Sequence, residues 1–230
     1  MRLFAMLRER AGASEVTLEL GEGARVADAI AALGKAAEGL PLVMAVNREY
    51  APGDRVLDPG DELALIPPVS GGEGPSMPAA ASGSTSAEAA GPAARAHARV
   101  SSEPLSLDSL LARVRDPRAG AVVTFQGVTR EVERLDYEAY VEMAEERIAA
   151  IVAEAVARHE LCAAACEHRV GSVPLSEPSV AVACSAPHRR EAFAGAREVI
   201  DQVKAEAPIW KREVEAGEGR WVEGAPPPAA

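Results

Sequence analysis

Two lysines near the end of the chain have the type and spacing that best suit catalysis. Lys204 and Lys211 flank the sequence Ala-Pro-Ile-Trp at 207–210. The first falls at the end of a predicted helix and the second at the start of a predicted strand, so the turn between them can bring both amines together. A lysine held near other cations in a partly dry pocket has a lowered pKa and serves as a nucleophile or general base. Two lysines taken alone are more often surface charges, and the pattern leaves both interpretations open.

Further basic residues lie where predicted strands end. His188 and Arg189 stand in the sequence Pro-His-Arg-Arg, at the start of a predicted helix whose unpaired N–H groups and positive dipole end favour an anion. This pattern indicates a phosphate site, with a solvated basic helix start as the alternative. Arg130 follows Val128 and Thr129 just past another strand, where α+β proteins often gather binding residues. Its alternative interpretation is an ordinary loop charge.

A glycine pair, Gly71 and Gly72, follows Pro-Pro-Val-Ser at 67–70 and closes the first part of the chain. Adjacent glycines adopt backbone conformations closed to other residues and can thread a narrow channel. A Gly-Gly end performs acyl chemistry through a free carboxyl group, whereas here a peptide bond joins Gly72 to Glu73. We therefore expect acyl chemistry at Gly72 only after this bond has been cut.

Composition limits the classes of partner. The chain has 230 residues and a formal net charge of −11, which disfavours non-specific binding to nucleic acid or acidic membranes. The three cysteines form no Cys-x-x-Cys motif and no even set, so they indicate a reduced, cytoplasmic protein, and we expect no metal site. His159 and His168 are interpreted as structural. We find neither a signal-peptide pattern nor a run of about 18 apolar residues.

Residues 1–72 have the pattern of a small mixed domain. The sequence predicts a strand at 2–7, and alternation with period two predicts another at 15–20. A short apolar run predicts a strand at 42–47, and the alternating segment at 61–66 predicts a fourth. Apolar residues at helical spacing predict a helix at 26–33. This order of elements in a unit of this size predicts a sheet wrapped on one helix, as in a β-grasp.

The composition changes abruptly to Ala, Gly, Ser and Pro at residues 73–99. Such a segment buries too little apolar surface to offset its ordering entropy, which predicts a flexible linker. Residues 100–224 then predict an α+β domain. Its helices are expected at 106–114, 141–159 and 188–205, and its strands at 120–127, 136–140, 166–173, 179–184 and 209–215, with a closing hairpin to residue 222.

Short motifs of the second domain occur in a defined order. They are Gly-Ala-Val-Val-Thr-Phe at 120–125, Gly-Val-Thr-Arg at 127–130, Tyr-Glu-Ala-Tyr at 137–140, His-Arg-Val-Gly at 168–171, Pro-His-Arg-Arg-Glu-Ala-Phe at 187–193 and Pro-Ile-Trp-Lys-Arg-Glu at 208–213. This series resembles the large, catalytic (MoaE-like) subunit of molybdopterin synthase. The first 72 residues, with their Gly-Gly end, resemble its small sulfur-carrier (MoaD-like) subunit, a ubiquitin-like β-grasp domain. The resemblance implies a fusion of the two.

The resemblance implies an enzyme of molybdenum cofactor biosynthesis, a sulfurtransferase that converts cyclic pyranopterin monophosphate to molybdopterin by installing two dithiolene sulfurs. In this family the sulfur arrives as a thiocarboxylate on the last glycine of the carrier, which corresponds to Gly72. A partner enzyme first adenylates that glycine with ATP, and no tightly bound cofactor is implied. The family forms dimers, so we expect a homodimer through the catalytic domain.

The resemblance also implies which residues form the site. Lys204 is expected to be the chief catalytic lysine beside the thiocarboxylate, and Lys211 to complete the pocket. The residues that match the family's substrate-binding motifs are Val128, Thr129, Arg130, His188, Arg189, Arg212 and Glu213. After Arg130 the family usually has an Asn-His-Asn and Gly loop, whereas this chain has Glu-Val-Glu-Arg at 131–134, which alters the substrate contacts expected there.

Two other functions fit parts of the pattern. A ubiquitin-like module tethered to a degenerate domain would be a non-catalytic scaffold or carrier for other biosynthetic proteins. The joint presence of Lys204, Lys211, His188 and Arg130 argues against it, and the altered loop argues for it. A generic acyltransferase would instead use Gly72 for protein conjugation.

Overall fold

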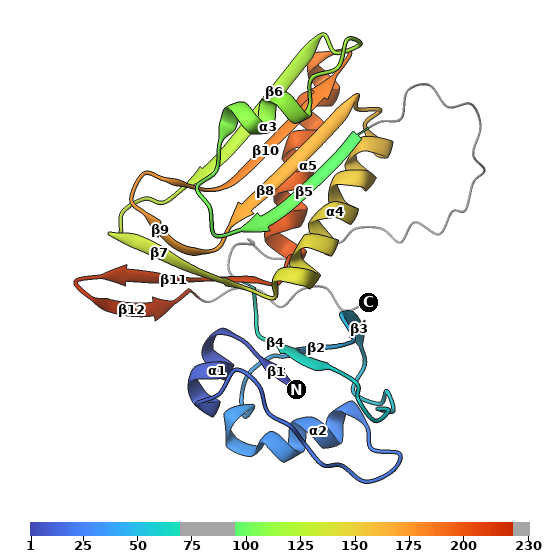
Figure 1. Cartoon of the computed structure of the whole chain (residues 1–230), viewed down its shortest axis with the longest axis vertical. Helices are drawn as coiled ribbons and strands as arrows, with labels where there is room; N and C mark the ends of the chain where they lie inside the picture. Colours follow the sequence, from blue (N-terminus) through green and yellow to red (C-terminus); the bar gives the residue numbers. More distant parts are fainter. Residues whose placement is uncertain (70–94, 223–230) are drawn as a thin grey trace.

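The computed structural model describes residues 1–69 and 95–222. A small N-terminal unit and a larger C-terminal unit follow one another along the chain (Figure 1). Gly72 and residues 73–94 of the predicted linker lie outside the described residues. Each unit combines helices with a sheet, which confirms the predicted α+β class.

The N-terminal unit is a four-stranded sheet wrapped on a helix. Its elements are β1 (Arg2–Leu3), α1 (Ala5–Ala11), α2 (Val26–Leu33), the 3-10 turn η1 (Gly34–Ala36), β2 (Val43–Val46), β3 (Glu49–Ala51) and β4 (Leu63–Ile66). The strand order is β1-β4-β2-β3, with β1 parallel to β4 and the other neighbours antiparallel. Leu3, Val26 and Leu65 are buried together between the sheet and α2. This arrangement is the predicted β-grasp.

The start of this unit differs from the prediction. Residues 5–11 form helix α1 and not a strand, because Ala-Met-Leu-Arg-Glu-Arg-Ala consists of strong helix formers and Gly12 ends the helix in the left-handed conformation, with φ 69°. Residues 15–20 do not form a regular strand, and an isolated bridge joins Glu15 to Arg2. Val16 and Leu18 pack on the core, so the alternation marks a half-buried segment outside the sheet.

The described residues of the C-terminal unit form two four-stranded sheets and three helices. The elements are β5 (Arg95–Ser101), α3 (Leu107–Arg113), β6 (Ala121–Val128), β7 (Arg134–Ala139), α4 (Val141–Arg158), β8 (Ala163–Arg169), β9 (Gly171–Pro174), β10 (Pro178–Ala186), α5 (Arg189–Glu206), β11 (Ile209–Glu215) and β12 (Glu218–Trp221). One sheet has the order β5-β8-β10-β6 and the other β12-β11-β7-β9.

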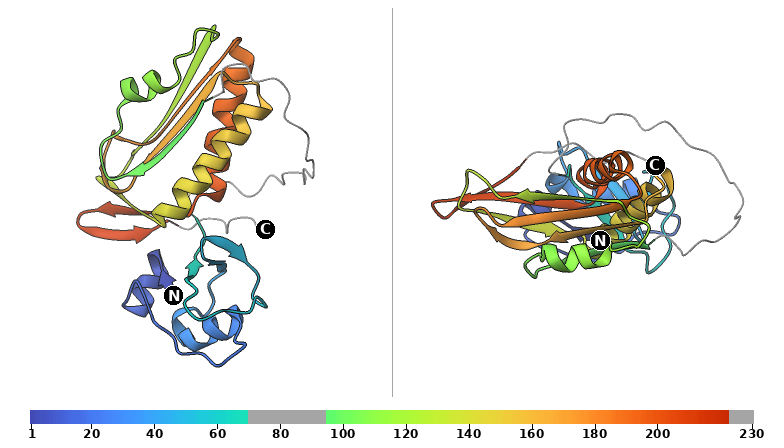
Figure 2. Two further views of the ribbon diagram at one scale, coloured as in Figure 1. Left: turned by 45° about the vertical axis from the view of Figure 1, so that its right-hand side comes forward. Right: turned by 90° about the horizontal axis from the view of Figure 1, so that it is seen from above.

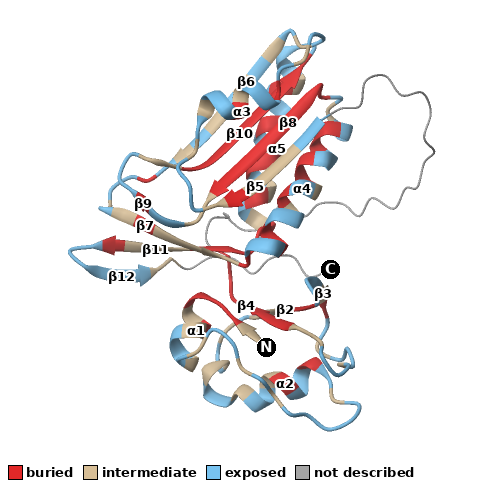
Figure 3. Ribbon diagram, in the orientation of Figure 1, coloured by how far each residue is buried: buried red, intermediate tan, exposed pale blue. Residues whose placement is uncertain are grey.

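Helices α4 and α5 cover one face of the first sheet, and α3 covers the other (Figure 2). The predicted helical stripe of α4, which includes Ile148, Ile151 and Val152, is fully buried against this sheet. Strands β8 and β10, at the centre of the sheet, are buried along most of their length (Figure 3). The core of the unit therefore lies between this sheet and the α4–α5 pair.

Strand β5 lies where a linker is predicted, so the linker prediction is wrong for residues 95–99. The strand pairs in parallel with β8, from Arg95 opposite Ala163 onwards. His97 and Arg99 each have a nitrogen 2.9 Å from a carboxylate oxygen of Glu167, which is 3% exposed. Strand β5 is therefore held by a backbone ladder and by the contacts with Glu167. Its residues do alternate between polar and apolar, but two of the three apolar ones are alanine, so the segment shares the Ala-rich composition of the predicted linker.

The two units share one apolar cluster. Phe4 of the N-terminal unit stacks on Tyr140 and on Trp210, with ring centroids 5.1 and 5.0 Å away. Val69 and Met143 belong to the same cluster, and all five side chains are buried. The N-terminal unit therefore lies against the end of the C-terminal unit where α4 and β11 begin.

Ion pairs surround this cluster. In three of them an arginine of the N-terminal unit meets a glutamate of the C-terminal unit: Arg8 with Glu138 at 2.8 Å, Arg2 with Glu142 at 3.5 Å and Arg48 with Glu146 at 2.5 Å. At least one side chain in each pair is half-exposed, and such pairs contribute about 0–1 kcal/mol each. The apolar cluster thus dominates the contact between the units.

Candidate active site

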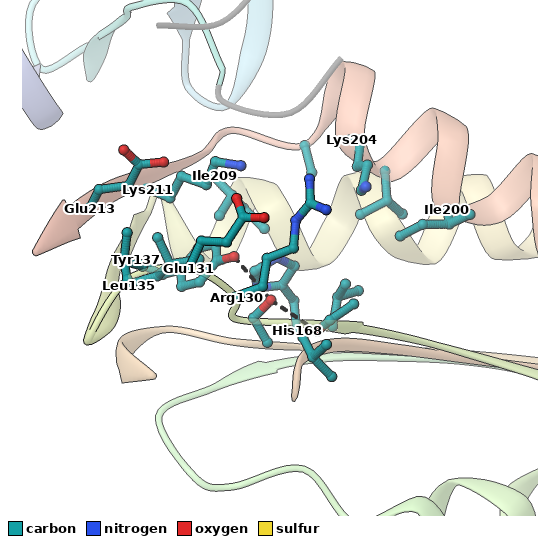
Figure 4. A pocket seen from close by; sticks show the side chains of 17 residues that line it. Arg130, Glu131, Leu135, Tyr137, His168, Ile200, Lys204, Ile209, Lys211 and Glu213 are labelled. Carbon is teal, nitrogen blue, oxygen red and sulfur yellow. Dashed lines mark hydrogen bonds between the residues drawn. The ribbon is translucent and has the colours of Figure 1, made fainter. Parts of the chain in front are cut away.

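A cavity of about 500 Å³ opens in the C-terminal unit, between the end of α5, the start of β11 and the end of β6 (Figure 4). Its polar lining consists of Arg130, Glu131, Tyr137, His168, Ser179, Lys204, Lys211 and Glu213. Its apolar lining includes Val128, Val132, Leu135, Ile200, Val203 and Ile209. A cavity of this size with a few convergent polar groups suits a small-molecule ligand.

The structure brings Lys204 and Lys211 into this one cavity. Lys204 belongs to the last turn of α5 and Lys211 to β11, and the tight turn at 207–208 folds the strand back under the helix. Burial lowers the pKa of Lys211, and the nearby cations Lys204 and Arg130 act in the same direction, whereas Glu213 opposes them. A lysine of this kind releases its proton more readily than a surface lysine does.

Arg130 reaches the cavity from the end of β6, and its guanidinium is directed towards Lys204 (Figure 4). Val128 also lines the cavity and is 50% exposed. Thr129 is 1% exposed and turns away, since its hydroxyl donates to the Val173 carbonyl at 3.4 Å and its amide donates to Glu177. Thr129 therefore anchors the loop that directs Arg130 and does not line the cavity.

The acidic segment 131–134 begins at the cavity. Glu131 and Val132 line it, and Glu131 has a φ of 64°. This carboxylate faces the same space as three cationic side chains and offsets part of their charge. An anionic ligand in this cavity is therefore repelled by Glu131 and attracted by the three cations.

His168 also lines the cavity, although the sequence indicates a structural role for it. Its Nδ1 lies 2.8 Å from the Arg169 carbonyl oxygen and donates to it, which leaves Nε2 as an acceptor. Burial lowers the pKa of His168 to about 4, and the charge of Lys204 contributes, so the ring is neutral at pH 7. Tyr137 packs edge-on against it with centroids 5.1 Å apart. The sequence held one indication that His168 lies on the same side as the cavity. It is two residues from Cys166 on a strand, so both side chains point to the face of the sheet that the helices cover.

His188 and Arg189 lie at the opposite end of α5 from Lys204. The helix has 18 residues, which at 1.5 Å per residue makes it about 27 Å long. Both side chains are exposed. The chain does not bring them to its own cavity, and their assignment to the substrate site stays a prediction that requires a second chain.

Neighbouring residues on β11 point to opposite sides. Glu213 lines the cavity with Lys211, because residues two apart on a strand share a face. Arg212 points the other way and donates to Asp136 at 3.3 Å and to Glu9 of the N-terminal unit at 3.5 Å. The structure thus places Arg212 at the contact between the units and outside the cavity lining.

The end of the N-terminal unit reaches the strand that supplies Lys211. Trp210 donates its Nε1 hydrogen to the Pro67 carbonyl at 3.0 Å. Val69, the last described residue of this unit, is 2% exposed in the same cluster. The predicted acyl residue Gly72 follows three positions later, outside the described residues.

Within residues 1–69 and 95–222, no group of three or more His, Cys, Asp or Glu side chains is arranged to hold a metal ion. The three cysteines are unpaired and buried, and burial raises the pKa of Cys184 to about 12, so that thiol stays protonated and acts in packing. No helix in the described part of the chain has both the length and the apolar content needed to cross a bilayer.

Both units match known families. Residues 100–206 match the family model described as MoaE protein, and residues 1–72 match that of the ThiS family. Over 119 residues the chain is 46% identical to the molybdopterin synthase catalytic subunit of Thermoplasma volcanium, an alignment that covers 49% of this chain and 87% of that protein. This chain belongs to the molybdopterin synthase catalytic-subunit family. We refer below to its N-terminal unit as the carrier domain and to its C-terminal unit as the catalytic domain.

Other proteins of the molybdopterin synthase family are also similar to this chain in sequence or in structure. The catalytic subunit of Oryza sativa is 53% identical over 107 residues, which are 44% of this chain but 55% of the rice protein, so the chain spans about half the length of that relative. The crystal structure of molybdopterin synthase from Staphylococcus aureus aligns with a TM-score of 0.51 and 32% identity, over 53% of this chain and 93% of that one. The MoaE protein of Burkholderia ambifaria gives 0.50 and 36%, over 56% and 89%.

Proposed function

We propose that this chain is a fused molybdopterin synthase, which converts cyclic pyranopterin monophosphate to molybdopterin with sulfur from a thiocarboxylate on Gly72. The position of the carrier domain carries this proposal: Trp210, which binds Pro67, directly precedes Lys211, which lines the cavity. Three residues lead from Val69 to Gly72, and three extended residues span about 10 Å. That length supports entry of the carrier's end into the cavity beside β11.

Each proposed sulfur transfer forms two bonds and breaks two. The thiocarboxylate sulfur bonds to a carbon of the substrate as a carbon–oxygen bond at that carbon breaks and the oxygen leaves with a proton. Water then attacks the acyl carbon, the acyl–sulfur bond breaks, the sulfur stays on the substrate and Gly72 is left as a carboxylate. Lys204 supplies positive charge beside the thiocarboxylate and stabilises the anion that develops there. Lys211, whose pKa is lowered, is suited to accept the proton that water loses.

The phosphate of the substrate is proposed to lie between Arg130 and a pair of residues from a second copy of the chain. Strand β6 is an edge strand, whose first residues lie beside the start of α5 and whose last residues lie beside the cavity. A two-fold axis beside the middle of β6 would bring His188 and Arg189 of the partner subunit to this chain's Arg130. Val122 and Phe193, exposed by 47% and 63%, support a contact on this side.

Mixing two variants tests this shared site. Lys204→Ala and Arg189→Ala homodimers are each expected to be nearly inactive. A mixed dimer contains one intact site if the arginine comes from the partner subunit, so mixing should restore up to half of the activity per mixed dimer. Mixed dimers without activity would place Arg189 and Lys204 in the same chain's site, and an active Arg189→Ala homodimer would remove Arg189 from the site.

The bond between Gly72 and Glu73 is proposed to be cut before sulfur is loaded. An adenylating partner enzyme needs a free carboxyl group, and in the intact chain that carbonyl is an amide. Glu73→Pro makes the bond resistant to most proteases and leaves Gly72 unchanged, with Glu73→Ala as the control. In cells without other carriers, Glu73→Pro should abolish molybdopterin formation and Glu73→Ala should not. Molybdopterin made by a protein that intact-mass analysis shows to be uncut would contradict cleavage.

Lys204→Ala tests the catalytic assignment. We expect turnover to fall by a factor of about 10²–10⁴, typical for loss of a positioned acid–base or charged group, with the fold intact. Lys35→Ala is the matched control, because Lys35 lies in η1 of the carrier domain, outside the cavity. Wild-type turnover by Lys204→Ala would remove the assignment, whereas absence of turnover in the wild-type protein would favour the scaffold alternative.

A further inference from the structure

The last turn of α5 carries Lys204 and ends two residues later at Glu206. The final four carbonyl groups of a helix have no partners within it, and a glutamate there is opposed by the negative end of the helix dipole. Ala207 follows in an extended conformation, with φ −71° and ψ 128°, so no left-handed glycine caps this end. The turn that positions Lys204 therefore depends on contacts from outside the helix.

One such contact comes from α4. Arg147 donates from Nε to Oε2 of Glu206 at 2.7 Å and from Nη2 to the same oxygen. Their side chains are 33% and 11% exposed, so the pair is partly shielded from solvent. Arg147 offsets the unfavourable charge of Glu206 at the helix end and ties that end to α4. Loss of Arg147 would leave a largely buried carboxylate without its partner, which is costly.

The other contact comes from the carrier domain. Tyr50, on β3, donates its hydroxyl hydrogen to the backbone carbonyl of Glu206 at 3.3 Å. That carbonyl is one of the helix-terminal acceptors. The carrier domain thus supplies a capping hydrogen bond to the catalytic helix, two residues from Lys204.

We propose that Tyr50 and the Arg147–Glu206 pair are positioning residues that couple docking of the carrier domain to the placement of Lys204. This inference rests on the proposed function, because it takes Lys204 as the catalytic residue. When the carrier leaves, the Glu206 carbonyl loses its hydrogen bond from Tyr50 and the last turn of α5 opens more readily. Lys204 is therefore fully ordered when a carrier domain is docked.

A second contact between the domains provides a matched control. Arg48 of the carrier pairs with Glu146 on α4, and both side chains are about half-exposed. Tyr50→Phe and Arg48→Gln each remove one polar contact between the domains. Only Tyr50→Phe removes a contact with α5. A general weakening of docking affects both variants alike, whereas the proposed coupling affects only the first.

The test is amide hydrogen exchange of the full-length chain, measured by mass spectrometry on peptides 200–207 and 189–197. Loss of one neutral hydrogen bond changes a local opening equilibrium by about two- to tenfold. Tyr50→Phe should therefore exchange faster by that factor in 200–207 and at the wild-type rate in 189–197. Arg48→Gln should match wild type in both. Wild-type exchange of 200–207 in Tyr50→Phe, or equal acceleration in both variants, would overturn the proposal.

The role of Arg147 is tested by measuring exchange of the same peptide, 200–207. Arg147→Met removes the charge and the hydrogen bonds at Glu206, so exchange of 200–207 should accelerate. Arg147→Lys retains the charge and should restore most of the protection. Equal exchange in the two variants would contradict a role for this ion pair.

Turnover separates positioning from substrate binding. In sulfur-loaded protein, Tyr50→Phe should lower kcat by a similar two- to tenfold and leave KM for the pterin unchanged, because the cavity lining is untouched. Arg48→Gln should change neither. Wild-type kcat in Tyr50→Phe would also overturn the coupling. Absence of turnover in sulfur-loaded wild type beside a preserved difference in exchange would instead refute the proposed function alone.

Discussion

The buried His168 makes the stability of this protein dependent on pH. Its pKa is lowered from 6.5 to about 4 in the folded state, mainly by burial. Between these two values the unfolded chain binds a proton that the folded chain does not, so stability is fully present above pH 6.5 and is lost as the pH falls towards 4. With a shift of this size, the step from pH 7 to pH 5 removes about 2 kcal/mol of unfolding free energy.

His168→Asn isolates this contribution, because an amide does not titrate and its NH₂ group can replace the Nδ1 donor to the Arg169 carbonyl. Urea unfolding of wild type and His168→Asn at pH 7 and pH 5 gives the four free energies required. The wild type should lose about 2 kcal/mol more than His168→Asn between the two pH values.

Two results would refute this reasoning. One is an equal loss of stability in wild type and His168→Asn. The other is an NMR titration of the folded protein in which the His168 ring protonates near pH 6.5. Either would mean that the cavity solvates the imidazolium well, for instance through Glu131.

Two further substitutions test packing that supports the site. Trp210→Phe leaves the Pro67 carbonyl without its hydrogen bond and should lower the unfolding free energy by about 1–3 kcal/mol; Trp221→Phe should cost less, because Nε1 of Trp221 makes no hydrogen bond among the described residues. Gly120→Ala would place a Cβ 2.4 Å from the Pro187 carbonyl oxygen and should lower the unfolding free energy by at least about 1–3 kcal/mol in a thermal or urea melt. Gly21→Ala is the control, because its Cβ meets nothing within 4 Å, and it should change the unfolding free energy by less than about 0.5 kcal/mol.

The long helices and central strands could be predicted from the sequence because their patterns are local. Helix α4 has an apolar stripe of period 3.6, and the structure buries that stripe. Ser106 was expected to cap a helix, and its hydroxyl accepts from the Ser109 amide at 3.3 Å. Both lysines of the cavity were found in the same way, since one turn at Pro208 separates their elements.

The features that the sequence did not predict depend on partners far along the chain. Residues 95–101 alternate between polar and apolar, but two of the three apolar residues are alanine, so the segment resembles the Ala-rich sequence before it. The partners that hold it as strand β5, Glu167 and the backbone of β8, lie far along the chain. The start of helix α1 was predicted as a strand because residues 3–7 form an unbroken apolar run, and so short a run does not distinguish a strand from a helix. The length of α5 sets the distance between His188 and Lys204, and the sequence motifs that contain these residues do not reveal that distance.

The apolar centre and half-exposed rim of the contact between the two domains also limit how long a carrier domain stays docked on the catalytic domain. Molybdopterin needs two sulfurs, and in the proposed reaction each visit of a carrier delivers one. A spent carrier must therefore leave, be reloaded and return, or be replaced by another, before the product is complete. A rim of weak ion pairs around Phe4 and Val69 favours fast release. A tighter contact would slow the enzyme, so turnover limits how strongly these two domains can bind each other.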